Sequence, residues 1–229
     1  MNKMNILAFD SSDEILSAAL ETEKGVWYSE IDAGSRHSEL LMECIDGLVK
    51  SAGLSPPDLN AVVCAKGPGS FTGLRIGYSA AKGFCLALGI PLIAVPTLDC
   101  LANPLSMWPG LVIPAIDAKK GCFFTALYRG GALIGDYMDA DPCTIATMVE
   151  KAALGSDEPI VLTGSGAGML HSSLTAFIPR KDRIVHLTSR RGIAKEMLEI
   201  AKGGRYEGVN DIGSGPEYIR KSDADLNLG

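Results

Sequence analysis

The chain has 229 residues, 47% of them apolar and 21% charged, which is enough to form one large α/β domain or two small lobes. Its net charge of −6 argues against a stand-alone nucleic-acid-binding protein, because such proteins normally carry a basic excess. The apolar runs are much shorter than the roughly 20 residues that span a bilayer, and the N-terminus lacks the core of a signal peptide. We therefore expect a cytoplasmic protein with no membrane contact.

The first sixty residues predict three strands and a helix. A buried strand over 5–10 ends in Asp10, and further strands are expected around 15–21 and 26–31. Apolar residues at spacings of three and four then predict an amphipathic helix over 37–52, which ends before a glycine and two prolines.

A glycine-rich segment joins the next strand, 61–65, to a second helix. The segment reads Gly-Pro-Gly-Ser-Phe-Thr-Gly-Leu-Arg-Ile-Gly from residue 67 to residue 77. Within the helix, Gly73, Gly77 and Ala81 recur every four residues. Glycine in a helix costs about 1 kcal/mol relative to alanine, so two on one face predict the close approach of another backbone.

The second part of the chain repeats the first. The strand 112–117 ends in aspartate like the strand 5–10, and a hairpin follows both. The strand 160–163 runs into glycines as the strand before Gly67 does. We therefore predict an α/β fold of two duplicated lobes, an N-terminal lobe over 1–108 and a C-terminal lobe over 109–229.

Side chains that carry common catalytic chemistry are scarce. The six cysteines form no Cys-x-x-Cys pair, and we interpret them as reduced, buried thiols. The three histidines, His37, His171 and His186, include no pair at i and i+4, so no metal site is predicted. Because no serine lies in a Gly-x-Ser-x-Gly motif and no cysteine has a recognisable histidine partner, we assign no catalytic residue.

Two aspartates at equivalent strand ends suggest a nucleotide cleft. Such carboxylates can hold Mg²⁺ through water, and neighbouring hydroxyls and glycine amides can reach phosphate oxygens. The alternative is that each aspartate only caps its strand end. Neither glycine segment has the spacing of a dinucleotide or P-loop fingerprint, which argues against a standard dinucleotide-binding fold or a P-loop NTPase. We expect a vestigial cleft that requires no cofactor, in which any binding of ATP or ADP is weak. Its candidate residues are Asp10, Ser11, Ser12, Gly67, Gly69, Asp117, Gly164 and Gly166.

Basic residues gather late in the chain, at 180–183, 190–191 and 220–221. They form either a solvated surface or part of a phosphate or RNA track in a larger assembly.

The segment 67–77, placed between a strand and a helix, closely resembles the signature of the bacterial TsaB (YeaZ) family. The resemblance extends to the opening strand, Ile6–Ser12, with Ser11 where threonine is usual, and to His37-Ser-Glu-Leu-Leu41 in the first helix. It also covers the strand and turn 91–97 and the C-terminal Pro216-Glu-Tyr-Ile-Arg220, and more loosely 117–120 and 162–167. It spans nearly the whole chain and is strongest up to about residue 100.

This resemblance implies a fold of the actin/sugar-kinase/Hsp70 type, also called ribonuclease H-like. It further implies a non-catalytic scaffold that binds the TsaD transferase in making threonylcarbamoyl-adenosine next to the tRNA anticodon. The ATPase TsaE would join a larger complex, tRNA would be contacted only through that complex, and the chain alone would form a homodimer. TsaD-like proteins bind metal through a paired-histidine helix motif, whereas the helix at His37 has one histidine.

Family knowledge places the contact with TsaD on the two helices of the N-terminal lobe. The small residues there would allow close helix crossing, and the aliphatic ones would supply apolar burial. The alternative is that both helices only pack on their own sheet. The interface candidates are Leu41, Ile45, Leu48, Gly73, Gly77, Tyr78 and Ala81.

A competing hypothesis is a small ATP-dependent sugar or acid kinase of the same fold, with Asp10 and Asp117 as its metal and catalytic carboxylates. Against it, the chain is short for such a kinase and shows no substrate-binding insertion. A peptidase, as the family is sometimes labelled, lacks supporting residues.

Overall fold

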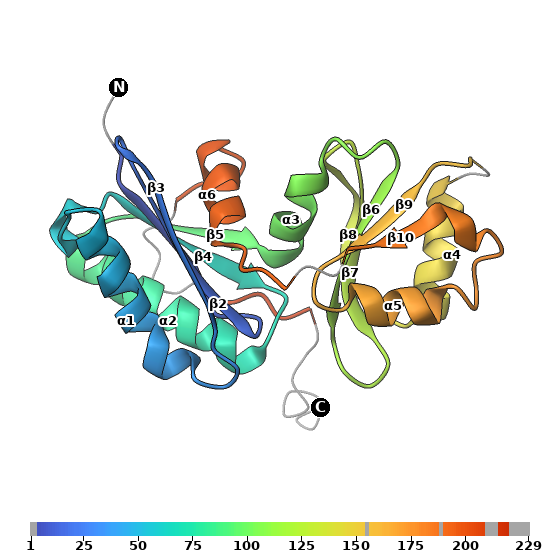
Figure 1. Ribbon diagram of the computed structural model, residues 1–229, viewed down its shortest axis with the longest axis horizontal. Coiled ribbons are helices and arrows are strands. Elements are labelled where there is room, and N and C mark those ends of the chain that lie inside the picture. The colour runs from blue at the N-terminus through green and yellow to red at the C-terminus, as the bar shows by residue number, and fades with distance from the viewer. Residues whose placement is uncertain (1–3, 154–155, 188–189, 209–214, 220–229) are drawn as a thin grey trace. The chain divides into compact units, whose positions relative to one another are not determined.

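The computed structural model describes residues 4–153, 156–187, 190–208 and 215–219 (Figure 1). The chain divides into two compact units. The first comprises Met1–Cys100 and Arg191–Glu217, and the second Leu101–Arg190 and Tyr218–Gly229. Each unit contains one five-stranded mixed sheet with helices, which confirms the predicted duplicated α/β fold.

The sheet of the first unit has the strand order β3-β2-β1-β4-β5. β1 pairs antiparallel with β2 and parallel with β4, and β4 pairs parallel with β5. The first three strands therefore form a meander, and two parallel strands extend it on the other side. The bounds are β1 Ile6–Asp10, β2 Ile15–Thr22, β3 Gly25–Asp32, β4 Ala61–Gly67 and β5 Leu92–Pro96.

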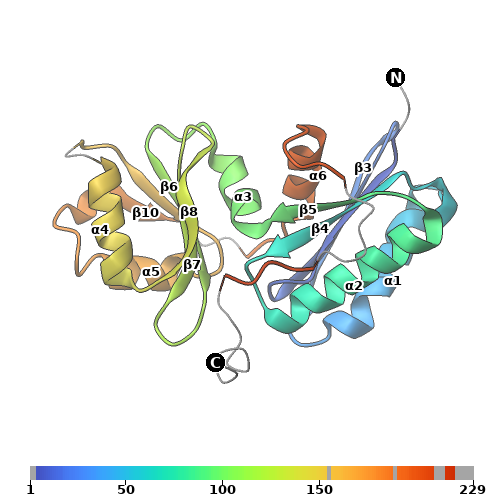
Figure 2. The ribbon, with the colours of Figure 1, turned by 180° about the vertical axis from the view of Figure 1, so that it is seen from behind.

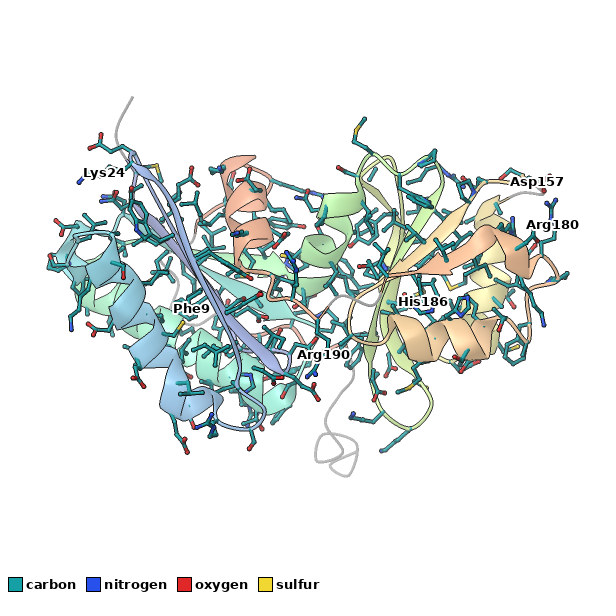
Figure 3. All side chains as sticks on the ribbon, viewed as in Figure 1. Phe9, Lys24, Asp157, Arg180, His186 and Arg190 are labelled. Carbon is teal, nitrogen blue, oxygen red and sulfur yellow. The ribbon has the colours of Figure 1, made fainter. Side chains whose placement is uncertain are left out.

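Helices cover both faces of this sheet. α1 (His37–Ser51) and α2 (Phe71–Leu88) lie side by side on one face, and α6 (Ala194–Lys202) lies on the other (Figures 1 and 2). Because side chains alternate along a strand, Leu7 and Phe9 face α1 and α2 in one core cluster. The Phe9 ring lies 6.4 Å from that of Phe84 on α2, measured between ring centroids (Figure 3).

The second unit repeats this topology with the order β8-β7-β6-β9-β10. β6 takes the place of β1: it pairs antiparallel with β7 and parallel with β9. The helices α4 and α5 share a core cluster with these strands, as α1 and α2 do in the first unit. The bounds are β6 Leu111–Asp117, β7 Phe123–Arg129, β8 Ala132–Ala140, α4 Pro142–Ala153, β9 Ile160–Thr163, α5 Ala167–Leu174 and β10 Ile184–His186.

The boundary between the lobes differs from the one expected after residue 108. The chain passes into the second unit at residue 101, within α3 (Thr97–Ala102). The segment after α3 packs in the second unit, where the Trp108 indole N–H donates to the Pro159 carbonyl at 3.2 Å.

The expected C-terminal lobe, 109–229, is also too long, because residues 191–217 return to the first unit. There α6 contacts β1, β2, β4 and β5. The backbone N–H of Ala194 donates to Ser17 Oγ on β2 at 3.2 Å, and Lys202 pairs with Glu21 on the same strand. Residues 191–217 therefore pack with the first sheet, because the apolar face of α6 is buried against its strands.

The cysteines are free thiols, as expected, but not all are buried. Cys44, Cys64 and Cys100 are buried, Cys85 and Cys122 are half-buried, and Cys143 is exposed on α4. The expectation of a buried thiol is therefore wrong for Cys143.

The C-terminal motif forms no strand over the residues that the structure describes, 215–219. The Glu217 N–H nevertheless donates to the Lys66 carbonyl at the end of β4, at 2.8 Å. Arg220 and Lys221 lie outside the described residues. In the described ranges, no helix combines the length and apolar character needed to cross a membrane.

Candidate functional site

Asp10 at the end of β1 is buried, with 2% of its surface exposed. Its Oδ1 atom accepts the backbone N–H of Ser12 at 2.9 Å. Burial is the largest influence on this carboxyl group and raises its pKa from 3.8 to about 6. Asp10 thus has the surroundings of a strand-end cap, the second interpretation that the sequence left open.

The start of α2 lies directly against the turn that follows β1. Ser11 Oγ donates to the Gly73 carbonyl at 2.8 Å, and the Ser70 N–H donates to the Ser12 carbonyl at 2.8 Å. A Cβ atom at Gly73 would lie 1.9 Å from the Ser11 carbonyl oxygen, and one at Gly69 would lie 2.8 Å from Ser12 Cβ. The close backbone approach predicted from the glycines is therefore present, and the approaching backbone belongs to the same chain.

The Ser12 side chain is also buried at this contact. It lies beside the Asp10 carboxyl group and partly offsets the rise of the Asp10 pKa. Gly67, at the end of β4, has a φ of +111°. A Cβ atom at this position would lie 2.7 Å from the Glu217 carbonyl oxygen. The first unit thus brings together Asp10, Ser11, Ser12 and Gly69, whereas Gly67 packs on the C-terminal segment.

The equivalent strand end in the second unit holds Asp117. Its carboxylate accepts the Lys119 N–H at 2.8 Å and pairs with Lys119 Nζ at 2.8 Å. The hydrogen bond from the Lys119 side chain is the largest cause that lowers the Asp117 pKa. The Gly166 N–H donates to the Ala115 carbonyl at 2.9 Å, and a Cβ there would lie 3.0 Å from Asp117 N. Gly164 packs on the same carbonyl, with a φ of +92°.

In each unit, then, the aspartate at the strand end bonds to groups of its own turn. Over the described ranges, no group of three or more His, Cys, Asp and Glu side chains could hold a metal ion. His37 at the start of α1 is buried, and its Nε2 lies 2.7 Å from the Asp13 carbonyl, so this ring holds the turn before β2 against the helix.

The predicted interface residues face the interior. All seven are buried: the core of the first unit contains Leu41, Ile45 and Leu48 of α1 with Tyr78 and Ala81 of α2, and Gly73 and Gly77 lie against Ser11. The assignment of these side chains to a partner surface is therefore wrong. The amphipathic stripe on each helix packs on the helix's own sheet, which was the alternative considered.

The outer faces of α1 and α2 present other residues. Met42 is 51% exposed, Phe71 43% and Leu86 67%. Arg75 stacks over the Phe71 ring, with 3.7 Å from its guanidinium carbon to the ring centroid. The exposed residues Arg75, Ser79, Gly83 and Leu86 follow one another at helical spacings of four, four and three. We call this surface the outer face of α2. The sequence could have indicated it, because these residues occupy the helix positions between those of the buried stripe.

Two of the late basic residues lie in ion pairs within the second unit. Arg180 pairs with Asp157 (Figure 3). Arg183 pairs with Glu150 and donates to the Ser156 carbonyl. These pairs favour the interpretation of this segment as a charged surface stabilised within its own unit.

The two repeated sheets, each with an aspartate at the end of its first or equivalent strand, define a class of duplicated α/β proteins. Residues 21–165 match the family model of TsaD, tRNA N6-adenosine threonylcarbamoyltransferase. The chain is 30% identical to the tRNA threonylcarbamoyladenosine biosynthesis protein TsaB of Bacillus subtilis, over 97% of this chain and 96% of that protein. It is 35% identical to TsaB of Escherichia coli over 55% of each chain.

A solved structure agrees with these relatives. An uncharacterized Pseudomonas aeruginosa protein, described as similar to the peptidase YeaZ, superimposes with a TM-score of 0.80 and 28% identity, covering 95% of this chain and all of that one. The chain belongs to the TsaB (YeaZ) family.

Two glycines of α2 provide a matched test of the backbone contact. Gly73→Ala places a methyl group against the Ser11 carbonyl and should destabilise the protein by about 3 kcal/mol. Gly83→Ala, at an exposed position with nothing within 4 Å, should stabilise it by up to about 1 kcal/mol. Urea unfolding of both variants measures the difference. Equal effects would contradict the proposed role of the contact.

The raised pKa of Asp10 predicts a pH-dependent stability. The folded state holds its proton more tightly than the unfolded state, so the contribution of this group is full below about pH 4 and is lost as the pH rises through about 6. Asp10→Asn keeps an acceptor for the Ser12 N–H and should stabilise the protein by up to about 3 kcal/mol at neutral pH, but little at pH 4.

Urea unfolding at both pH values checks this prediction. Asp136→Asn, which alters an exposed carboxyl group on β8, is the control and should have little effect at either pH. Loss of stability in Asp10→Asn at neutral pH would mean that the ionised carboxylate stabilises the fold.

Proposed function

We propose that the chain is a non-catalytic scaffold subunit that binds a TsaD transferase and supports the formation of threonylcarbamoyl-adenosine next to the tRNA anticodon. The observation that carries this proposal is the similarity to Bacillus subtilis TsaB along nearly the whole of both chains. A partner enzyme would supply the transfer chemistry, and tRNA would be contacted only through the complex. TsaE would join the larger assembly, and the setting would be cytoplasmic.

The local chemistry supports a role without catalysis. Asp10 is buried and bonded to Ser12, and Asp117 is bonded to Lys119. A single histidine stands on α1, and its Nε2 is engaged with a backbone carbonyl. A paired-histidine metal site of the transferase type therefore has no counterpart on this helix. These contacts also weigh against the kinase alternative, in which both aspartates would have to be open to ligands.

The outer faces of α1 and α2 are the surface that we propose for the TsaD contact. The two helices lie side by side on the first sheet, so their outer faces form one continuous surface (Figure 2). Met42, Phe71 and Leu86 offer exposed apolar area, and the small residues Ser79 and Gly83 would let a partner helix approach closely. When TsaD is absent, a second copy would cover the same surface and form a homodimer.

A bulky charge in the middle of this surface should block the partner. We expect Ser79→Arg to remain folded and to lose the complex with the TsaD protein of the same organism, because the new side chain stands where two helices would cross. Size-exclusion chromatography with light scattering measures the complex. Ser172→Arg, at an exposed serine on α5, is the matched control and should bind like the wild type.

The outcomes separate the surface from the function. If the wild type binds and Ser79→Arg binds equally well, the proposed surface is wrong. If the wild type forms no complex at micromolar concentrations, the scaffold function itself fails. ATP turnover by the purified chain then tests the alternative, since a kinase would transfer or hydrolyse phosphate and a scaffold with weak nucleotide binding would not.

A further inference from the structure

Two of the three histidines of the chain lie against each other in the second unit. His171 is on α5, and His186, labelled in Figure 3, ends β10. Their ring centroids are 4.6 Å apart, and the rings are tilted by 45°. Fifteen residues separate them in sequence, so the pair exists only through the packing of α5 on β10. Among the residues that the structure describes, no hydrogen bond engages a nitrogen of either ring.

The backbone beneath the pair is fixed by the core. Leu170 and Leu174 of α5 and Ile184 of β10 are buried in the cluster of the second unit. β10 is hydrogen-bonded to β9, including a 2.9 Å bond from the Leu187 N–H to the Leu162 carbonyl. The two imidazoles thus extend from elements that the core holds in place. His171 is half-buried and His186 is exposed.

The spacing of the rings suits a shared metal ion. With metal–nitrogen bonds of about 2.1 Å and ring nitrogens about 1.1 Å from the ring centre, two imidazoles on one metal at about 90–110° hold their centres about 4.5–5.2 Å apart. The observed 4.6 Å lies within this range. Rotation about each Cβ–Cγ bond turns a nitrogen toward the metal and leaves the ring centre in place, because that axis runs through the ring.

From this geometry we propose that His171 and His186 form a two-histidine site for a late first-row divalent transition metal such as Ni²⁺, Cu²⁺ or Zn²⁺. Imidazole nitrogen prefers these ions, whereas Mg²⁺ and Ca²⁺ prefer oxygen ligands. Because the described residues offer no third ligand, water or an external ligand completes the coordination.

The test titrates the purified chain with Ni²⁺ alone and follows the histidine ring signals by NMR. Paramagnetic Ni²⁺ should broaden the signals of His171 and His186 together at low metal ratios and leave His37 sharp, because the His37 ring is buried and bonded to a carbonyl. Mg²⁺ should broaden neither signal.

Calorimetric titration of variants provides the second readout. His171→Gln and His186→Gln should each weaken Ni²⁺ binding by about tenfold or more, since each removes one of two ligands. Cys143→Ser removes the exposed thiol as a competing ligand and should bind like the wild type. Broadening of one histidine alone, or equal affinity in wild type and histidine variants, would overturn the proposal. All variants alter exposed or half-buried side chains, and circular dichroism confirms that each is folded.

Discussion

The contact between the start of α2 and the turn after β1 is the constraint on which the first unit depends. Here two backbones approach so closely that position 73 has no room for a Cβ atom, and a serine hydroxyl joins them. The contact fixes the angle at which α2 leaves the sheet, and so brings Tyr78 and Ala81 into the core. The turn in this contact also holds Asp10, because the Ser12 N–H donates to the Asp10 carboxylate.

The second unit has the same topology, but different contacts hold the end of β6 than hold the end of β1. Its strand-end aspartate is held by the Lys119 side chain and stays partly exposed, and glycines 164 and 166 take the place of the packed helix start. Both solutions engage the carboxylate within its own turn. The outer surface of α1 and α2, by contrast, is exposed, and it is the surface that we propose for a protein partner.

The sequence predicted the strands, the main helices and the duplication, because apolar periodicity and glycine placement are local signals. It did not predict which part of the molecule packs against the small residues of α2, since a small residue indicates that another backbone comes close without indicating which one. Leu41, Ile45 and Leu48 were assigned to a partner for the same reason: an amphipathic face looks alike whether it meets a sheet or another protein. The return of α6 and the meeting of His171 with His186 depend on contacts between distant segments, which periodicity does not encode.

The return of α6 has a consequence for the order in which the protein folds on the ribosome. The strands of the first sheet are complete once β5 has emerged, but the face that α6 covers stays open while Leu101–Arg190 of the second unit is synthesised. The strands that α6 contacts include Ala8, Ala19 and Val63, which are buried in the complete protein. Their packing is incomplete until α6 has been synthesised. The nascent N-terminal half is therefore a half-covered sheet whose closing element is among the last to be translated.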